Sequence, residues 1–173
     1  MPSTGAGPVA VPHFRQAMAQ LAAAVSIVTT DGPAGRCGIT ATAVCAITDT
    51  PPTVLVCVNR GSAMNAVFKA NGRLCVNVLS GEHLELARHF AGLTQCPMAE
   101  RFASDDWRTG PGELPVLDGA RVNLLGRMAR VEEIGTHSLF FVELDAVHVD
   151  ARPGDALAYF NRAFHRVGSL SPA

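Results

Sequence analysis

The stretch CGITATAVCAITDTPP, from Cys37 to Pro52, decides how the rest of the chain is interpreted. Its first residues predict one long strand, 37–47, that ends before the double proline, because proline cannot donate to a β-ladder. Thr40 and Thr42 share one face of this strand, with only alanines beside them. Either they are simply good strand formers on a solvent face, or a flat ligand lies near the backbone and needs hydroxyl and amide donors.

Composition limits the classes of protein to consider. The chain has 173 residues, of which 48% are hydrophobic and 17% charged, which is typical of one compact globular domain. A net charge of −1 argues against nucleic acid or an anionic membrane as the main partner, since both favour a basic surface. No apolar run reaches the roughly 18–20 residues that span a bilayer.

The leader MPSTGAGPVAVP has neither a basic start nor a long apolar run, so we expect no signal peptide and a cytoplasmic location. We therefore predict a flexible tail over residues 1–12, a single domain over 13–168 and a short tail over 169–173.

The cysteines predict neither a disulfide framework nor a metal site. There are five, an odd number, and no two form a C-x-x-C pair. Cys45, Cys57 and Cys75 lie in apolar runs and are expected to be buried thiols. The histidines lack metal-ligand spacing, so no metal is expected.

Hydrophobic periodicity predicts a mainly β protein with short helices. The pattern indicates strands at 25–30, 37–47, 53–59, 73–79, 121–133, 137–149 and 156–160, and helices at 14–24, 62–72 and 81–92. Residues 94–112 are expected to be irregular, with one helical turn near 98–102. Because no βαβ pattern repeats, an antiparallel β-barrel with peripheral helices fits better than a doubly wound sheet.

No catalytic motif stands out from the residues alone. There is no P-loop and no nucleophile elbow inside the domain. Gly32, Gly35 and Gly38 lie between two strands with no helix after them, so they do not form a dinucleotide fingerprint. If the chain is an enzyme, its reactive chemistry is expected to come from a cofactor.

Nine blocks in order resemble one known family. They are AAAVSIVTT, GITATAVCA, TDTPP, NGRLCVNVL, ARHFAG, ERF, PVLDG, IGTH and YFNRAFHRV. Together they resemble the flavin reductase family, which has the FMN-binding split-barrel fold, over about Phe14 to Val167. ARHFAGLT and RAFHRV are most similar to the reductase components of two-component 4-hydroxyphenylacetate 3-monooxygenases. The DGPAGR turn is shared with a sister group, the flavin reductases of pyrimidine breakdown.

The resemblance implies where the flavin would lie. It places FMN or FAD across the interface of a homodimer, held by the second strand and by the end of the third, with Arg60 as the phosphate partner. Phe90 would contribute to the far end of the flavin, or is simply a core residue. The implied cofactor-binding residues are Thr29, Thr30, Gly38, Ile39, Thr40, Ala41, Thr42, Ala43, Cys57, Val58, Asn59, Arg60, Ser62, Arg88 and Phe90.

The resemblance also implies a nicotinamide site for NADH or NADPH. His137 matches a histidine that lies close to the nicotinamide in relatives and is the expected catalytic-site residue, unless it is only a hydrogen-bonded residue at a strand start. Four residues of the C-terminal motif would close over the same pocket, or anchor the last strand: Tyr159, Phe160, Arg162 and His165.

These expectations imply hydride transfer from NAD(P)H to a diffusible flavin, which then leaves for a separate oxygenase. Three alternatives stay open: a flavin carrier or sensor that does not use NAD(P)H, the reductase of a pyrimidine-degrading monooxygenase, and an enzyme like pyridoxamine-phosphate oxidase on the same barrel.

Overall fold

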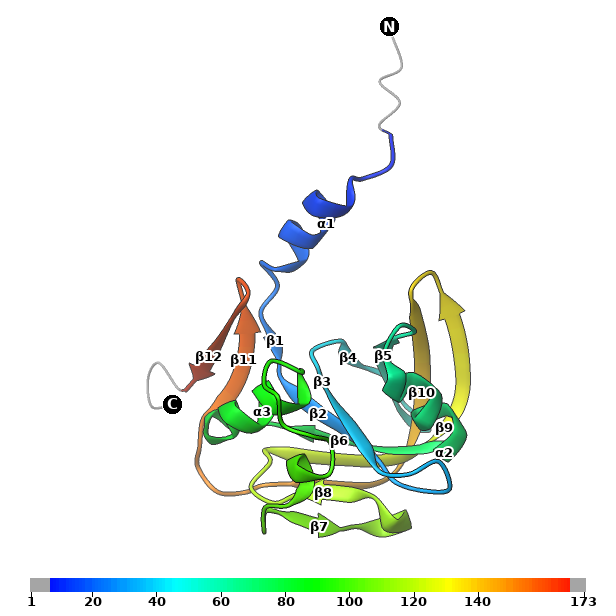
Figure 1. Cartoon of the computed structure of the whole chain (residues 1–173), viewed down its shortest axis with the longest axis vertical. Helices are drawn as coiled ribbons and strands as arrows, with labels where there is room; N and C mark the ends of the chain where they lie inside the picture. Colours follow the sequence, from blue (N-terminus) through cyan, green and yellow to red (C-terminus); the bar gives the residue numbers. More distant parts are fainter. Residues whose placement is uncertain (1–6, 169–173) are drawn as a thin grey trace, which may run out of the picture.

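A computed structural model describes residues 7–168 and shows a curled antiparallel sheet with short helices around it (Figure 1). Its seven strands follow the order β3-β2-β6-β9-β10-β5-β4. They are β2 (Ser26–Thr30), β3 (Cys37–Ala41), β4 (Val44–Asp49), β5 (Pro52–Asn59), β6 (Arg73–Val78), β9 (Val122–Ile134) and β10 (His137–Val149). Every pairing between them is antiparallel.

The link between β3 and β4 explains why the sheet curls. These strands are the two edges of the sheet, yet only Thr42 and Ala43 connect them. In a flat sheet the outer two of seven strands would lie roughly 29 Å apart, whereas so short a link spans at most about 11 Å. The sheet must therefore bend until its edges approach each other. β3 and β4 do not pair with one another, so the barrel is split along this line.

Two smaller sheets complete the β-structure. One is three-stranded, in the order β1-β11-β12, and the other is the pair β7-β8. Their strands are β1 (Ala23–Ala24), β11 (Ala156–Phe160), β12 (Ala163–Val167), β7 (Trp107–Thr109) and β8 (Pro115–Leu117).

The helices lie outside the sheet. They are α1 (Val11–Met18), α2 (Ala63–Asn71) and α3 (Leu84–Phe90), with single 3₁₀ turns η1 (Gly81–His83), η2 (Glu100–Phe102) and η3 (Pro111–Glu113). Ser62 caps α2 by accepting from the Met64 N–H, and Gly72 ends it at φ 68°, as the sequence predicts. Among residues 7–168, no helix is long and apolar enough to cross a bilayer.

The core fills the inside of the curled sheet. β5 alternates as its sequence predicts, with Val54, Val56 and Val58 buried. Phe68 of α2 packs against Phe140 of β10, their ring centroids 6.2 Å apart, and both are fully buried. A second cluster beneath α3 includes Val25, Leu79 and Phe90.

Most predicted strands are confirmed, but several expectations are wrong. The stretch predicted as one strand, 37–47, forms two strands, β3 and β4, because the chain passes from one edge of the sheet to the other at Thr42. The helix predicted at 14–24 begins at Val11 and ends at Met18, so the expected tail boundary after residue 12 falls inside α1. Strands β1, β7, β8 and β12 were not predicted, and β1 lies within the stretch expected to be helical. The tail 169–173 and residues 1–6 lie outside the described residues.

The cysteines differ from expectation in one case. Cys75 is buried and Cys57 is half-buried, but Cys45 is exposed because β4 is an edge strand with an open face. Burial raises the pKa of the Cys75 thiol to about 12.

Candidate functional site

A cavity of about 510 Å³ opens where the barrel is split. Its size is in the range of small-molecule sites. β3 and the link to β4 form one wall, and the end of β5 with the start of α2 forms another. The lining residues are Gly38, Ile39, Thr40, Ala41, Thr42, Ala43, Cys57, Val58, Asn59, Ser62, Met64, Phe90, Ala91, Gly92, Met98, Arg101 and His137.

Gly38 allows the end of α3 to approach β3. A Cβ built at this glycine would stand 2.7 Å from Cε1 of Phe90, closer than real contacts allow. The Phe90 ring in turn packs edge-on against Phe102 and Trp107, with centroids 5.0 and 5.6 Å away. The aromatic cluster therefore holds the inner wall of the cavity in place.

Thr40 and Thr42 have different roles. The Thr40 hydroxyl donates to the Ala87 carbonyl at 2.6 Å, which ties β3 to α3. Because a hydroxyl has one hydrogen, Thr40 can offer a ligand only an acceptor oxygen. Thr42 is exposed and its hydroxyl has no partner among the described residues. Only one of the two threonines is thus free to donate.

The link between the strands supplies further donors. The N–H groups of Thr42 and Ala43 donate to no other group of the described chain, and both residues line the cavity. Backbone donors without partners on a cavity wall suit a ligand that carries carbonyl or ring-nitrogen acceptors.

The start of α2 provides a site for an anion. Ser62 lines the cavity at the N-terminus of this nine-residue helix. Its hydroxyl oxygen accepts from the Met64 N–H, so its hydrogen is free to donate. A helix N-terminus carries a partial positive charge, which favours a phosphate.

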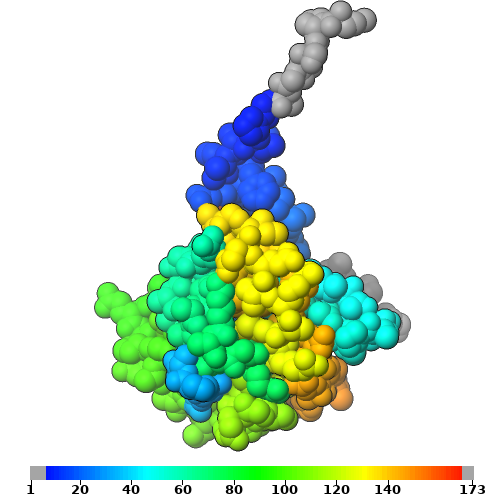
Figure 2. Space-filling model, turned by 90° about the vertical axis from the view of Figure 1, so that its right-hand side faces the viewer, coloured from blue at the N-terminus to red at the C-terminus, as the bar shows by residue number. Residues whose placement is uncertain are grey.

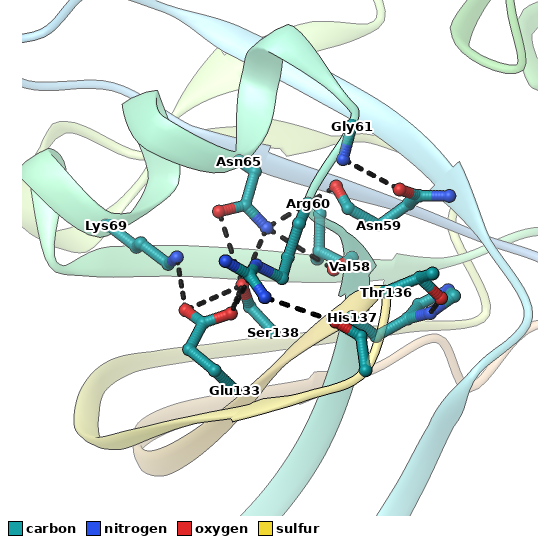
Figure 3. A network of polar contacts seen from close by, with 11 residues as sticks. Val58, Asn59, Arg60, Gly61, Asn65, Lys69, Glu133, Thr136, His137 and Ser138 are labelled. Atoms are coloured by element: carbon teal, nitrogen blue, oxygen red, sulfur yellow. Dashed lines mark hydrogen bonds and ion pairs between the residues drawn. The ribbon is translucent and has the colours of Figure 1, made fainter.

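A polar network joins this end of the cavity to the β9–β10 turn (Figure 3). The Arg60 N–H donates to the Thr136 carbonyl at 2.9 Å, and the Arg60 guanidinium pairs with Glu133 at 3.0 Å. Lys69 of α2 donates to the same carboxylate. These contacts, led by the hydrogen bond from Lys69, lower the pKa of Glu133.

Beneath this ion cluster lies a buried amide. The Asn65 Nδ2 group donates to the Val58 carbonyl at 3.3 Å and to Ser138 Oγ at 3.0 Å. Ser138 stands directly across the ladder from Glu133 and contacts its carboxylate. The network therefore fixes the hairpin turn against α2 and, with it, the position of the residue before Ser138.

The residue before Ser138 is His137, the first residue of β10. Its Cα lies opposite that of Asn59 in the ladder, so both occupy the same rim of the cavity. The ring Nδ1 is 2.9 Å from Thr136 Oγ1, which orients the imidazole. Nε2 has no partner among the described residues and is free to contact a ligand.

The structure brings most of the predicted flavin-binding residues together. Those that line the cavity are Gly38, Ile39, Thr40, Ala41, Thr42, Ala43, Cys57, Val58, Asn59, Ser62 and Phe90, together with His137. Burial, and then the neighbouring Cys45, raise the pKa of the Cys57 thiol, which favours its neutral form.

Four predicted cofactor residues lie outside the cavity. Thr29 and Thr30 are fully buried, and their hydroxyls donate to the carbonyls of Pro115 and Arg73. Arg88 pairs with Glu85 on the exposed side of α3. Arg60 is held by Glu133 in the network described above.

The predicted nicotinamide residues of the C-terminal motif also lie elsewhere. Tyr159, Phe160, Arg162 and His165 belong to the β11–β12 hairpin and do not line the cavity of their own chain. Tyr159 packs edge-on against Phe164, and the ring of Phe160 lies 5.9 Å from that of His165. Within one chain, these residues anchor the hairpin.

Five residues that line the cavity were not among the predicted site residues. They are Met64 of α2, and Ala91, Gly92, Met98 and Arg101, which follow α3 in the sequence. Arg101 stands in the quoted block ERF, within a segment expected to be irregular, so its position could not be inferred from periodicity. The available signal was its place in ERF, one of the nine blocks that resemble the flavin reductase family.

A second cavity, of about 700 Å³, is larger but has a different character. It is lined by charged groups that already pair with each other, such as Asp150 with Arg121 and Arg152. These arginines hold the pKa of Asp150 at about 2. The smaller cavity has the unpaired donors and the predicted residues, so we take it as the functional site.

The fold and the site define a split barrel with an open, ligand-sized cavity. Residues 18–168 match the family model described as flavin reductase like domain, and the chain belongs to this family. It is 64% identical over 154 residues to the 4-hydroxyphenylacetate 3-monooxygenase reductase component of Pseudomonas aeruginosa strain PAO1, covering 89% of this chain and 90% of the relative.

Two further proteins show the range of relatives. The FMN reductase (NADH) RutF of Stutzerimonas stutzeri is 49% identical over 162 residues, covering 94% of this chain and 91% of the relative. The structure of the Streptomyces globisporus C-1027 NADH:FAD oxidoreductase SgcE6, in complex with NAD and FAD fragments, has a TM-score of 0.83. It is 26% identical and covers 96% of this chain and 100% of that one.

These comparisons confirm the predicted family and the split-barrel fold. They also confirm, at the level of the family, the prediction of a flavin-reducing enzyme that uses flavin and a nicotinamide cofactor. The homodimer, the cytoplasmic location and the roles of individual residues stay predictions.

Proposed function

We propose that the chain is an NAD(P)H:flavin oxidoreductase that supplies reduced FMN or FAD to a separate oxygenase of the 4-hydroxyphenylacetate 3-monooxygenase type. The observation that carries this proposal is the single cavity in which unpaired amides of the β3–β4 link, the start of α2 and His137 meet. The high identity to a named reductase component supports the choice of oxygenase.

The cavity residues suit a flavin as substrate. The Thr42 and Ala43 N–H groups would donate to polar atoms of the isoalloxazine ring, and the α2 N-terminus with Ser62 would hold the phosphate. Alanines at 41 and 43 keep the wall low enough for the ring to approach the backbone. Cys57 and Val58 provide an apolar surface beside it.

The reaction needs positioning more than acid or base groups. NAD(P)H and oxidised flavin are converted to NAD(P)⁺ and the reduced flavin anion when one hydride moves from nicotinamide C4 to flavin N5. Holding the nicotinamide and flavin rings in contact and correctly oriented lowers the entropic part of the activation barrier. His137, with Nε2 free at the cavity rim, would contact the nicotinamide and fix its approach.

A homodimer would complete the site. α1 projects away from the barrel, and its apolar side chains Phe14 and Met18 are exposed (Figures 1 and 2). Such an unpartnered apolar helix face favours burial against a second copy. The β11–β12 hairpin, whose residues do not line the cavity of their own chain, would then be free to serve the nicotinamide side of the partner's cavity.

The first test is NADH consumption by the purified protein with and without FMN, FAD or riboflavin, repeated with NADPH. Turnover that requires added flavin supports a reductase of diffusible flavin. Flavin binding without nicotinamide oxidation would contradict the proposal of a reductase and would leave a flavin carrier or sensor.

The role of His137 is tested with two variants. In His137→Ala, kcat/KM for NADH is expected to fall about ten-fold or more. His148 does not line this cavity, so His148→Ala should retain the wild-type kcat/KM.

The oxygenase assignment has its own test. Hydroxylation of 4-hydroxyphenylacetate is measured with a purified oxygenase component, NADH and flavin, with and without the chain. Product that depends on both proteins supports the assignment. Reductase activity that supports no hydroxylation here, but supports a pyrimidine-degrading oxygenase, would contradict it.

A further inference from the structure

The cavity contains one unpaired cation, Arg101. It is the only arginine or lysine of the lining, and the lining holds no carboxylate. Nearby Arg60 and Lys69, by contrast, both pair with Glu133. Arg101 makes no ion pair with any described residue, so its charge is uncompensated at the cavity wall.

Contacts within the chain fix the Arg101 side chain. Its Nε donates to the Cys96 carbonyl at 2.9 Å, and its guanidinium carbon lies 5.8 Å from the centroid of the Phe90 ring. The Arg101 carbonyl accepts from Trp107 Nε1 at 3.0 Å. The two terminal amino groups have no partner among the described residues, and a half-buried guanidinium with free donors is suited to an anion.

Arg101 lies on the opposite side of the cavity from the proposed phosphate site. Phe90, Met98 and Arg101 line the side next to α3, whereas Ser62 starts α2, and the two helices lie on either side of β3 (Figure 1). A flavin whose phosphate is held at α2 would extend its ring toward the Arg101 side.

We propose that Arg101 binds the isoalloxazine ring and stabilises the negative charge that the ring gains on reduction. Oxidised flavin has a neutral ring, and transfer of a hydride, two electrons and one proton, leaves it with one negative charge. A fixed guanidinium therefore interacts more strongly with the reduced ring than with the oxidised one. This inference rests on the proposed function and assigns a charge-stabilising residue to the same site.

The experiment measures flavin binding, separately from turnover. The single tryptophan, Trp107, lies 5.6 Å from Phe90, so quenching of its fluorescence reports flavin in the cavity. Dissociation constants are measured anaerobically for oxidised and dithionite-reduced FMN and riboflavin. The proteins are the wild type, Arg101→Gln, Arg101→Lys and the control Arg108→Gln, which removes a charge that is paired with Asp118 outside the cavity.

In Arg101→Gln we expect about ten-fold weaker binding of reduced FMN and of reduced riboflavin. Oxidised forms should change by less than about three-fold. Arg101→Lys should restore much of the preference for reduced over oxidised flavin. Arg108→Gln should have the same dissociation constants as the wild type. Circular dichroism and thermal melting confirm that each variant is folded.

Two results would overturn the inference. If Arg101→Gln loses affinity equally for oxidised and reduced FMN but loses none for riboflavin, Arg101 is a ligand of the phosphate instead. Unchanged dissociation constants for all flavin forms in Arg101→Gln would show that Arg101 does not bind the flavin. If the wild type binds neither form of flavin, the proposed function itself fails, a result distinct from both.

Discussion

At the scale of single residues, small side chains shape the cavity as much as polar ones do. Gly38 lets Phe90 pack on β3, and Thr40 uses its hydrogen to hold Ala87. The threonine that is free for a ligand is Thr42, where the strand has already ended. Strand formation on a solvent face does not account for either threonine alone: Thr40 is half-buried and ties β3 to α3, and Thr42 is exposed at the cavity.

Gly38→Ala is predicted to disturb this wall. The new Cβ would stand 2.7 Å from the Phe90 ring, which is confined by Phe102 and Trp107 and cannot move freely. Unfolding free energy should fall by about 1–3 kcal/mol, with weaker flavin binding. Denaturant melts check this, with Gly7→Ala as the control because nothing lies within 4 Å of its Cβ position. Full stability in Gly38→Ala would show that the ring yields easily.

At the scale of elements, strand type was predictable but connectivity was not. β2, β5, β6, β9 and β10 follow hydrophobic patterns and turn residues, and their bounds differ little from prediction. The break at Thr42 has no glycine or proline, because it arises from the change of sheet edge and not from local preference. β12 was missed because its residues are mostly exposed, which leaves no alternation to detect.

The ion cluster at the β9–β10 turn makes a prediction about pH. The folded pKa of Glu133 is lowered, chiefly by its hydrogen bond from Lys69. Its contribution to stability is therefore present above the unfolded value, about 4.3, and is lost as the pH falls through the folded pKa. The melting temperature of Glu133→Gln should lie below that of the wild type at neutral pH, and the difference should vanish in acid.

Melting temperatures at a series of pH values check this. Glu85→Gln, which loses only an exposed pair with Arg88, is the matched control and should differ little from the wild type at any pH. A difference between Glu133→Gln and the wild type that stays constant into acid would contradict the electrostatic account.

At the scale of the whole molecule, the cavity could be predicted only in part. The segments 38–43 and 57–62 and His137 were identified through resemblance, and the curled sheet brings them together. Arg101 was not predicted. Thr29, Thr30, Arg60 and Arg88 do not line the cavity, because hydrogen bonds and ion pairs within the chain hold their side chains elsewhere, and their part in cofactor binding stays a prediction. Sequence pattern does not determine such contacts between distant segments.

The homodimer leads to a prediction at this scale. The double variant Phe14→Asp/Met18→Asp places charges on the exposed apolar face of α1 and should weaken association at least ten-fold, since a buried unpaired charge is costly. Analytical ultracentrifugation over a concentration series measures this. Gln16→Asp, on the same helix but with no apolar side chain removed, should remain dimeric. A wild-type protein that sediments as a monomer would make the dimer prediction wrong.

The most direct measurement is anaerobic mixing of the protein with NADH and an excess of free FMN while the visible absorbance of oxidised flavin is followed. The account predicts that the absorbance is lost over many turnovers, with one NADH oxidised for each flavin reduced. Bleaching limited to one equivalent of bound flavin, or no bleaching with either nicotinamide cofactor, would contradict a reductase that releases its product to a separate oxygenase.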